Sequence, residues 1–192
     1  MENWFVRFIG RLVIKLGRWK IVEGLPKGVK KAVLVSGPHT SNWDFLWSRF
    51  AMYSLGVPVK FAIKKEFMRF PLGPILQGMG AIPIDRSNPG AGQAGGKSST
   101  EAIVEFFNRH EYLYLLVTPE GTRAYSPNWK TGFYYVAQQA GVPIFPAYLN
   151  YATREAGIGP RFEPTGDVEA DIEALKDFFR PIPGRYPEKG IR

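Results

Sequence analysis

The chain has 192 residues, of which 45% are hydrophobic and 22% are charged, which suits one domain with a buried core and excludes a disordered chain. The absence of cysteine excludes a disulfide scaffold, a thiolate metal site and a cysteine nucleophile. A net charge of +8 favours anionic partners, among them lipid headgroups, acidic carrier proteins, phosphorylated ligands and nucleic acid.

The first twenty residues predict an amphipathic helix with a basic stripe. Its four cations are spaced 4, 4 and 3 positions apart, so they fall on one narrow stripe, while nearly everything else is apolar. Because the cations interrupt the apolar run, the segment fits neither a secretory signal nor a spanning helix.

The wide apolar face of this helix favours a position in a membrane interface, with the basic residues toward lipid phosphates. The alternative is a helix packed on the core with a solvated basic edge. The residues expected to contact the membrane are Trp4, Arg7, Phe8, Arg11, Lys15, Arg18 and Trp19.

After this helix, short apolar runs alternate with segments of helical pattern. Strands are predicted over residues 21–24, 31–36, 57–63, 81–84, 112–118 and 143–151. Helices are predicted over residues 42–55, 67–79, 100–108, 132–140 and 167–179. A glycine-rich loop is predicted over residues 88–99, and coil over the final dozen residues.

This alternation predicts a single α/β domain over residues 21–192, preceded by the amphipathic helix of residues 1–20. Its central sheet is expected to be largely parallel or mixed and to be flanked by helices. In such sheets, functional groups gather at the carboxyl ends of the strands. Three polar clusters follow predicted strands and therefore fall where that rule puts a site.

The first cluster contains His39 and Asp44, after strand 31–36 and at the start of the next helix. A neutral histidine serves as a general base when a carboxylate orients its ring. Asp44 is close enough in sequence for that role, and with Ser41 it also has the spacing of a capping box. The alternative is that Asp44 only caps the helix and His39 lies in a turn.

The other two clusters have the chemistry of an anion site. Arg86 follows strand 81–84, where it suits a phosphate, the alternative being a surface salt bridge. After strand 112–118, Gly121 permits a tight turn, and Arg123 with the Thr122 hydroxyl suits a phosphate or carboxylate. Glu120 would orient Arg123 or bind a ligand hydroxyl. The alternative for this cluster is a strand-ending turn with an ion pair.

Four short blocks together resemble the glycerolipid acyltransferase family, which includes the bacterial 1-acylglycerol-3-phosphate (lysophosphatidate) acyltransferases. The blocks read PHTSNWD, GAIPIDR, TPEGTR and VPIFPA, in that order, and lie within about residues 31–151. Thr40, Pro83 and Thr118 depart from residues common in that family. These departures leave the chemistry intact and the identity of the acceptor open.

The resemblance implies a glycerol-3-phosphate acyltransferase-like fold and a membrane-associated O-acyltransferase. The enzyme would move a fatty acyl group from acyl-CoA or acyl carrier protein to a hydroxyl of a lysophospholipid-type acceptor. His39 would be the general base and Asp44 would orient it, with no acyl-enzyme intermediate. No metal or other cofactor is implied, and the protein is expected to be peripheral, on the cytoplasmic side of the inner or plasma membrane.

The same resemblance implies that the second and third clusters would bind the acceptor. Arg86 and Arg123 would hold its anionic headgroup, and the residues that shape the pocket would be Glu120, Gly121 and Thr122.

Two alternative functions remain open on the sequence. One is an acyltransferase for another lipid acceptor, such as a lyso-aminolipid, a glycolipid or a lipid A precursor. The other is a non-catalytic lipid-binding protein on the same fold, against which the intact pair of His39 and Asp44 argues. Nucleic acid is not an expected partner, because the sequence has no helix-turn-helix, ribonucleoprotein or zinc pattern.

Overall fold

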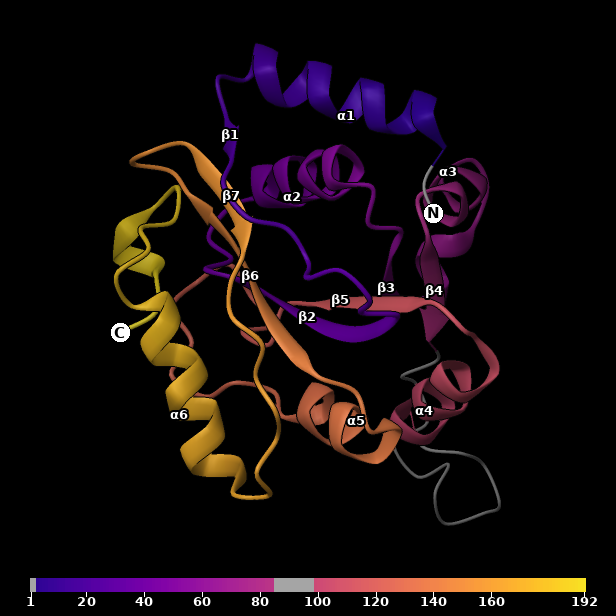
Figure 1. Cartoon of the computed structure of the whole chain (residues 1–192), viewed down its shortest axis with the longest axis vertical. Coiled ribbons are helices and arrows are strands. Elements are labelled where there is room, and N and C mark those ends of the chain that lie inside the picture. The colour runs from indigo at the N-terminus through magenta and orange to yellow at the C-terminus, as the bar shows by residue number, and fades with distance from the viewer. Residues whose placement is uncertain (1–2, 85–98) are drawn as a thin grey trace.

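The computed structural model describes residues 3–84 and 99–192 (Figure 1). Arg86 and the loop predicted over residues 88–99, apart from Ser99, lie outside the described residues. The helices are α1 (Trp4–Leu16), α2 (Asn42–Leu55), α3 (Leu72–Gly78), α4 (Ser99–Arg109), α5 (Gly132–Ala140) and α6 (Val168–Phe179), with 3-10 turns η1 (Lys65–Met68) and η2 (Pro187–Lys189). The strands are β1 (Lys20–Ile21), β2 (Lys31–Gly37), β3 (Val59–Lys64), β4 (Ala81–Ile84), β5 (Leu113–Val117), β6 (Ile144–Asn150) and β7 (Glu155–Ile158).

The described strands form one seven-stranded sheet in the order β1-β7-β6-β2-β5-β3-β4. Neighbouring strands are parallel, except that β6 and β7 are antiparallel. The predicted α/β domain with a largely parallel or mixed central sheet is therefore confirmed.

The central strand β2 is buried on both faces, because alternate side chains enter two different cores. Val33 and Val35 belong to the core under α4, α5 and α6, and Ala32 and Leu34 to the core under α2. All four are fully buried. A parallel strand covered on both faces needs such a continuous apolar run, which is why the sequence reveals this strand clearly.

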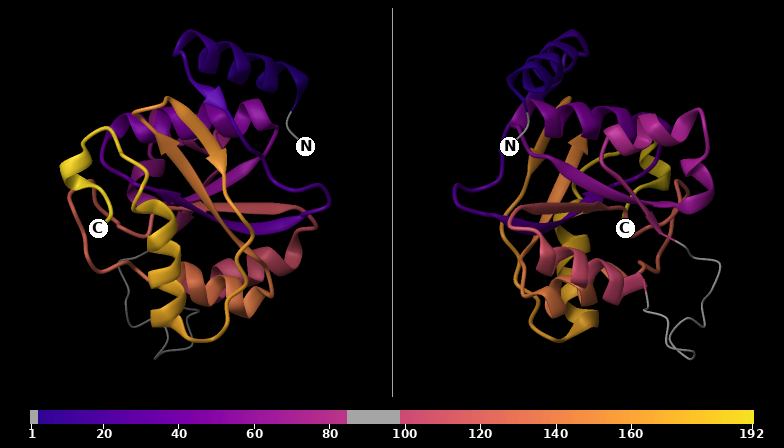
Figure 2. Two further views of the ribbon diagram at one scale, coloured as in Figure 1. Left: turned by 60° about the vertical axis from the view of Figure 1, so that its left-hand side comes forward. Right: turned by 90° about the vertical axis from the view of Figure 1, so that its right-hand side faces the viewer.

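The helices form layers on the two sides of the sheet. Helix α2 covers one face, and α4 and α5 cover the other (Figure 1). Helix α1 lies outside α2, so that it forms an outermost layer in all the views (Figure 2). Within the described part of the chain, no helix is both long and apolar enough to cross a membrane.

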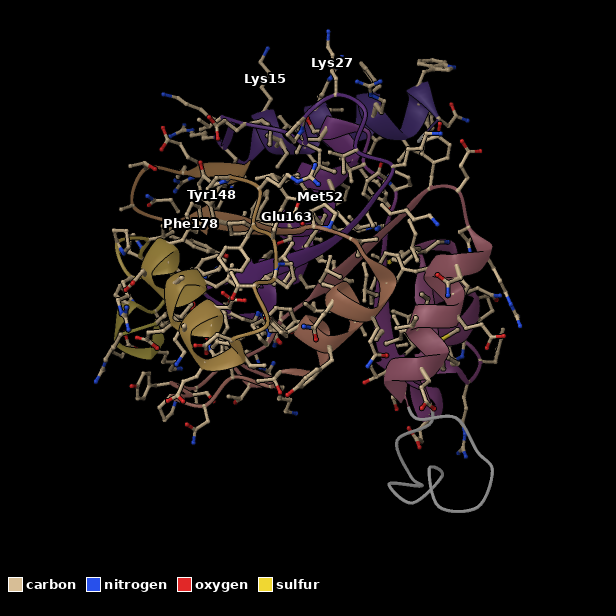
Figure 3. The ribbon with its side chains drawn as sticks, turned by 60° about the horizontal axis from the view of Figure 1, so that its bottom comes forward. Lys15, Lys27, Met52, Tyr148, Glu163 and Phe178 are labelled. Atoms are coloured by element: carbon tan, nitrogen blue, oxygen red, sulfur yellow. The ribbon has the colours of Figure 1, made fainter. Side chains whose placement is uncertain are left out.

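Helix α1 packs on α2 at a point of close backbone approach. Gly10 and Ile14 are the buried residues of α1. A Cβ added to Gly10 would lie 2.5 Å from the backbone nitrogen of Ser54, so only glycine permits this contact. The opposite face of α1 is exposed, and Lys15 points away from the body of the protein (Figure 3).

Two of the predicted membrane residues are not on that exposed face. Trp19 is only 6% exposed and packs against the rings of Trp47 and Tyr151, so its predicted membrane contact is wrong. Arg7 is half-buried and lies against Gly56, the C-cap of α2. A cation there interacts favourably with the negative end of the helix dipole. The sequence pattern shows which side of a helix is apolar, but not which part of that side a neighbour covers.

The C-terminal end of α1 and the first residue of the sheet also differ from the predicted boundaries. Helix α1 ends at Leu16, and Arg18 follows it with a positive φ of 57°. Strand β1 begins at Lys20 and pairs with β7, so the sheet starts inside the segment assigned to the N-terminal helix. The division into residues 1–20 and 21–192 stays a prediction.

Candidate active site

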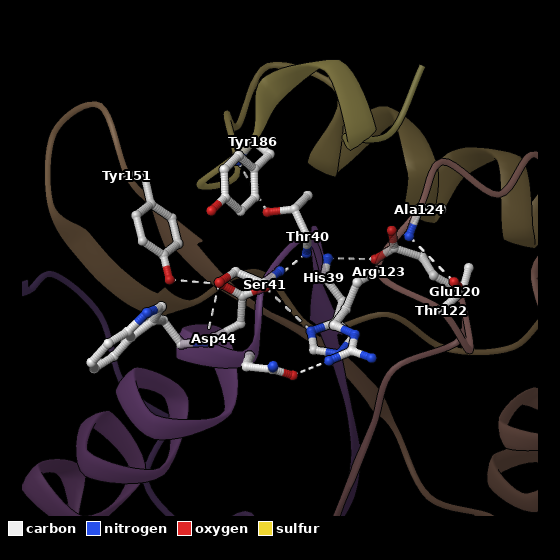
Figure 4. A network of polar contacts seen from close by, with 12 residues as sticks. His39, Thr40, Ser41, Asp44, Glu120, Thr122, Arg123, Ala124, Tyr151 and Tyr186 are labelled. Carbon is white, nitrogen blue, oxygen red and sulfur yellow. Dashed lines mark hydrogen bonds and ion pairs between the residues drawn. The ribbon is translucent and has the colours of Figure 1, made fainter.

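The first polar cluster lies where β2 ends and α2 begins. Ser41 caps α2 by accepting the backbone N–H of Trp43, and Asp44 completes the predicted capping box. The chain between β2 and α2 therefore turns tightly, which brings the ring of His39 back over the first turn of the helix. His39 Nδ1 lies 3.3 Å from Asp44 Oδ2 (Figure 4).

Asp44 is a buried carboxylate, 4% exposed, whose two oxygens are both engaged. Oδ2 accepts the backbone N–H groups of Thr40 at 2.7 Å and Ser41 at 2.8 Å, and Oδ1 accepts the Tyr151 hydroxyl at 2.6 Å. Burial acts to raise the pKa of Asp44, but these hydrogen bonds and the one from His39 outweigh it and hold the pKa below its ordinary value. Asp44 is thus kept ionised beside the His39 ring.

Glu120 is a second buried carboxylate, and it binds the backbone of the loop that carries His39. Its Oε1 accepts the backbone N–H of His39 at 2.7 Å, and the residue is 4% exposed. Burial raises the pKa of Glu120, and the hydrogen bond from His39 only partly opposes that rise. The structure therefore gives Glu120 a contact with the loop that carries His39, which the sequence did not indicate.

The residues after Glu120 form an exposed turn beside α2. Gly121 has a positive φ of 66°, and a Cβ there would lie 2.7 Å from the Lys130 side chain. The Thr122 hydroxyl accepts the backbone N–H of Ala124, and the Arg123 guanidinium donates to the side chain of Asn42. Arg123 is thereby placed at the first turn of α2. Arg86, the other predicted anion-binding residue, lies outside the described residues.

A largely apolar cavity of about 470 Å³ opens beside His39 and Asp44. It lies where β3 and β5 separate: their pairing ends at Phe61 and Leu116, while β3 continues along β4 and β5 along β2. Side chains from both faces of the sheet line it. Those from α2 include Phe45 and Ser48, and those from α4 and α5 include Ile103, Phe133 and Val136.

Three residues of the site were not predicted from the sequence. Tyr151 holds Asp44 from 107 positions further along the chain, Asn42 holds Arg123, and Lys130 lines the cavity. No local signal marks Tyr151, because its role depends on β6 ending next to α2. The described part of the chain brings together no group of three or more side chains suited to hold a metal ion.

This geometry combines a histidine beside a buried carboxylate, a largely apolar cavity and Lys130 in the cavity wall. The histidine is positioned for proton transfer by a buried carboxylate, and the cavity suits an extended apolar chain rather than a polar substrate. The fold and site thus define an α/β protein with a histidine–carboxylate pair at the wall of a largely apolar cavity.

A family model described as Acyltransferase matches residues 19–150, and the chain accordingly belongs to the acyltransferase family and is an acyltransferase enzyme. The fold is similar to the crystal structure of the 1-acyl-sn-glycerophosphate (LPA) acyltransferase PlsC from Thermotoga maritima, with a TM-score of 0.60 and 15% sequence identity. That similarity covers 90% of this chain and 76% of the other. No curated protein matches the sequence.

Proposed function

We propose that this acyltransferase transfers a fatty acyl group from a thioester, on acyl-CoA or acyl carrier protein, to a hydroxyl of a lysophospholipid such as 1-acylglycerol 3-phosphate. The observation that carries the proposal is the position of His39 beside buried Asp44 at the wall of an apolar cavity. The fold shared with a lysophosphatidate acyltransferase from Thermotoga maritima supports the choice of acceptor. No cofactor takes part in the reaction as proposed.

In the proposed reaction, Asp44 faces Nδ1 of His39 and leaves Nε2 for the substrate. Nε2 takes the proton of the acceptor hydroxyl as its oxygen attacks the thioester carbonyl. A C–O bond forms, the C–S bond breaks, and the proton passes from His39 to the leaving thiolate. Ionised Asp44 stabilises the imidazolium between these two transfers.

The other residues bind the substrates. The apolar cavity between β3 and β5 holds the acyl chain, and Arg123 at the first turn of α2 holds an anionic headgroup. Lys130 adds a positive charge at the cavity wall, close to Gly121. Arg86 is proposed for the same headgroup from the sequence resemblance alone.

We also propose that the enzyme attaches peripherally to the membrane through α1. Trp4 is 76% exposed and Leu16 74%, and Phe5, Phe8 and Leu12 are exposed between them. Arg11, Lys15 and Arg18 are exposed cations beside this apolar face. Such a face is suited to the boundary between lipid headgroups and acyl chains, with the cations at the phosphates.

The proposed reaction is tested by thiol release from palmitoyl-CoA and palmitoyl-carrier protein in micelles that contain lysophosphatidate. His39→Ala is expected to lower acceptor-dependent release by at least ~10²-fold, since it removes the general base. His110→Ala is the matched control, because His110 is exposed and lies at the end of α4, and it should keep full activity. Equal release by the His39→Ala variant and the wild type would contradict the mechanism.

A further inference from the structure

The segment that follows α6 folds back onto the loop that carries His39. The backbone N–H of Tyr151 donates to the Pro183 carbonyl at 3.1 Å, and the backbone N–H of Tyr186 donates to the Thr40 hydroxyl at 3.3 Å. A Cβ on Gly184 would lie 2.7 Å from the side chain of Thr40. Tyr186 is seen next to Thr40 in Figure 4. Residues 183–186 are therefore packed directly on the loop that carries His39 and Thr40.

This packing places the guanidinium of Arg185 beside the active site. Its central carbon lies 5.5 Å from the ring centre of Trp43 and 5.9 Å from that of Tyr186, which is cation–π distance. Arg185 is exposed, and no residue in the described ranges forms an ion pair with it. The cation thus lies against aromatic rings and forms no ion pair with a carboxylate of the described residues.

Two arginines consequently contact residues in the first turn of α2. Arg123 donates to Asn42, and Arg185 lies over Trp43, the next residue. Burial and the carboxylate of Asp44 raise the pKa of Tyr151, and the positive charge of Arg185 opposes that rise, as expected for a cation near the Tyr151 hydroxyl. Arg185 therefore belongs to the surroundings of the His39 and Asp44 pair, although it lies outside the residues that match the family model.

We propose that Arg185, together with Arg123, binds a substrate phosphate at the active site. This inference rests on the proposed function and adds to it a specificity-determining residue from the C-terminal segment. A phosphate accepts hydrogen bonds from a guanidinium fork, and two guanidinium groups suit its charge. The phosphate belongs either to the lysolipid acceptor or to the CoA of the donor, and the kinetics separate the two.

The test compares the wild type with Arg185→Ala and Arg185→Lys, using lysophosphatidate or the neutral monoacylglycerol as acceptor. Arg185→Ala is expected to raise the KM for lysophosphatidate about tenfold with kcat little changed, as for loss of one charge-assisted hydrogen bond. The KM for monoacylglycerol should not change, and Arg185→Lys should restore part of the loss. Arg161→Ala, an exposed arginine paired with Glu163, is the control and should have no effect.

A rise in the KM for palmitoyl-CoA, with the KM for lysophosphatidate unchanged, would assign the phosphate to the donor and still support the proposal. Unchanged KM values for both substrates, or an equal rise in the KM for the charged and for the neutral acceptor, would overturn it. Binding of lysophosphatidate micelles and of CoA is also measured by calorimetry, independently of turnover. If the wild type lacks acyl transfer, the proposed function fails, whereas weaker binding by Arg185→Ala would still support the phosphate site and equal binding would refute it.

Discussion

Asp44 and Glu120 are two buried carboxylates on either side of His39, and their surroundings shift their pKa values in opposite directions. Asp44 accepts hydrogen bonds on both oxygens, so its charged form is favoured in the folded protein. For Glu120, burial is the larger effect, so the pKa of Glu120 lies above its ordinary value. The different numbers of hydrogen-bond donors explain why one carboxylate suits the role of a fixed negative charge beside the histidine.

The hydrogen bonds of Asp44 predict a pH-dependent contribution to stability. Its folded pKa lies below the ordinary 3.8, so its stabilising effect is complete above that value and is lost as the pH falls through the folded pKa. Asp44→Asn is expected to lower the free energy of unfolding by about 1–3 kcal/mol at pH 7, because its amide group faces hydrogen-bond donors. Urea unfolding of both proteins between pH 7 and pH 3 should show this difference shrinking at the acid end.

Asp177→Asn provides the control for that experiment, since Asp177 is an exposed carboxylate on α6. Its difference from the wild type should be small at every pH. A difference between Asp44→Asn and the wild type that stays constant from pH 7 to pH 3 would contradict the role given to the ionised carboxylate.

At this scale, sequence reasoning succeeded where the partners are close in the chain. His39 and Asp44 are joined by a short loop and a capping box, so their pairing is a local property. Tyr151 and Glu120 reach the same loop from 107 and 81 positions away from their partners. Those contacts depend on which strands are neighbours in the sheet, and no spacing in one sequence specifies that order.

At the scale of secondary structure, α1 illustrates what an amphipathic pattern determines. The helix itself was predicted, but its apolar side is wider than the part that packs on α2. Gly10 and Ile14 pack on α2, while Phe8 and Leu12 remain exposed. Strand β7 was not predicted, since its four residues contain a glycine and no alternating apolar pattern, and its pairing with β6 places it in the sheet.

The contact between α1 and α2 predicts a position-specific effect of glycine substitution. Gly10→Ala is expected to destabilise the protein by about 1–3 kcal/mol, because the added methyl group overlaps the backbone of Ser54. Gly78→Ala is the matched control on α3, where a Cβ meets nothing within 4 Å. Chemical unfolding measures both variants, and equal stability of Gly10→Ala and Gly78→Ala would show that α1 does not pack on α2 as described.

At the scale of the whole molecule, the position of helix α1 and the net charge both suit contact with an anionic membrane. Helix α1 lies outside α2 with an exposed apolar face, and the chain carries a net charge of +8. An anionic membrane meets both features at once, because apolar side chains insert between lipids while cations bind phosphates. This position would place the active site at the surface where the proposed lysolipid acceptor resides.

The proposed attachment predicts binding to anionic vesicles through specific side chains. Phe8→Ser with Leu12→Ser is expected to reduce co-sedimentation with phosphatidylglycerol vesicles on the order of tenfold, because two exposed apolar groups no longer insert. Tyr135→Ser is the control, since Tyr135 is exposed on α5 on the opposite side of the sheet. Unchanged vesicle binding by the double variant would remove α1 from the membrane contact.

The separation of β3 from β5 also has an evolutionary consequence. Beyond Phe61 and Leu116, the two strands share no backbone pairing, yet each keeps its other neighbour in the sheet. Side chains that face the cavity there can change size without breaking the pairing that supports His39. Single substitutions in the cavity wall can therefore change the shape of the cavity among descendants of this protein, while the fold and the contact between His39 and Asp44 are inherited unchanged.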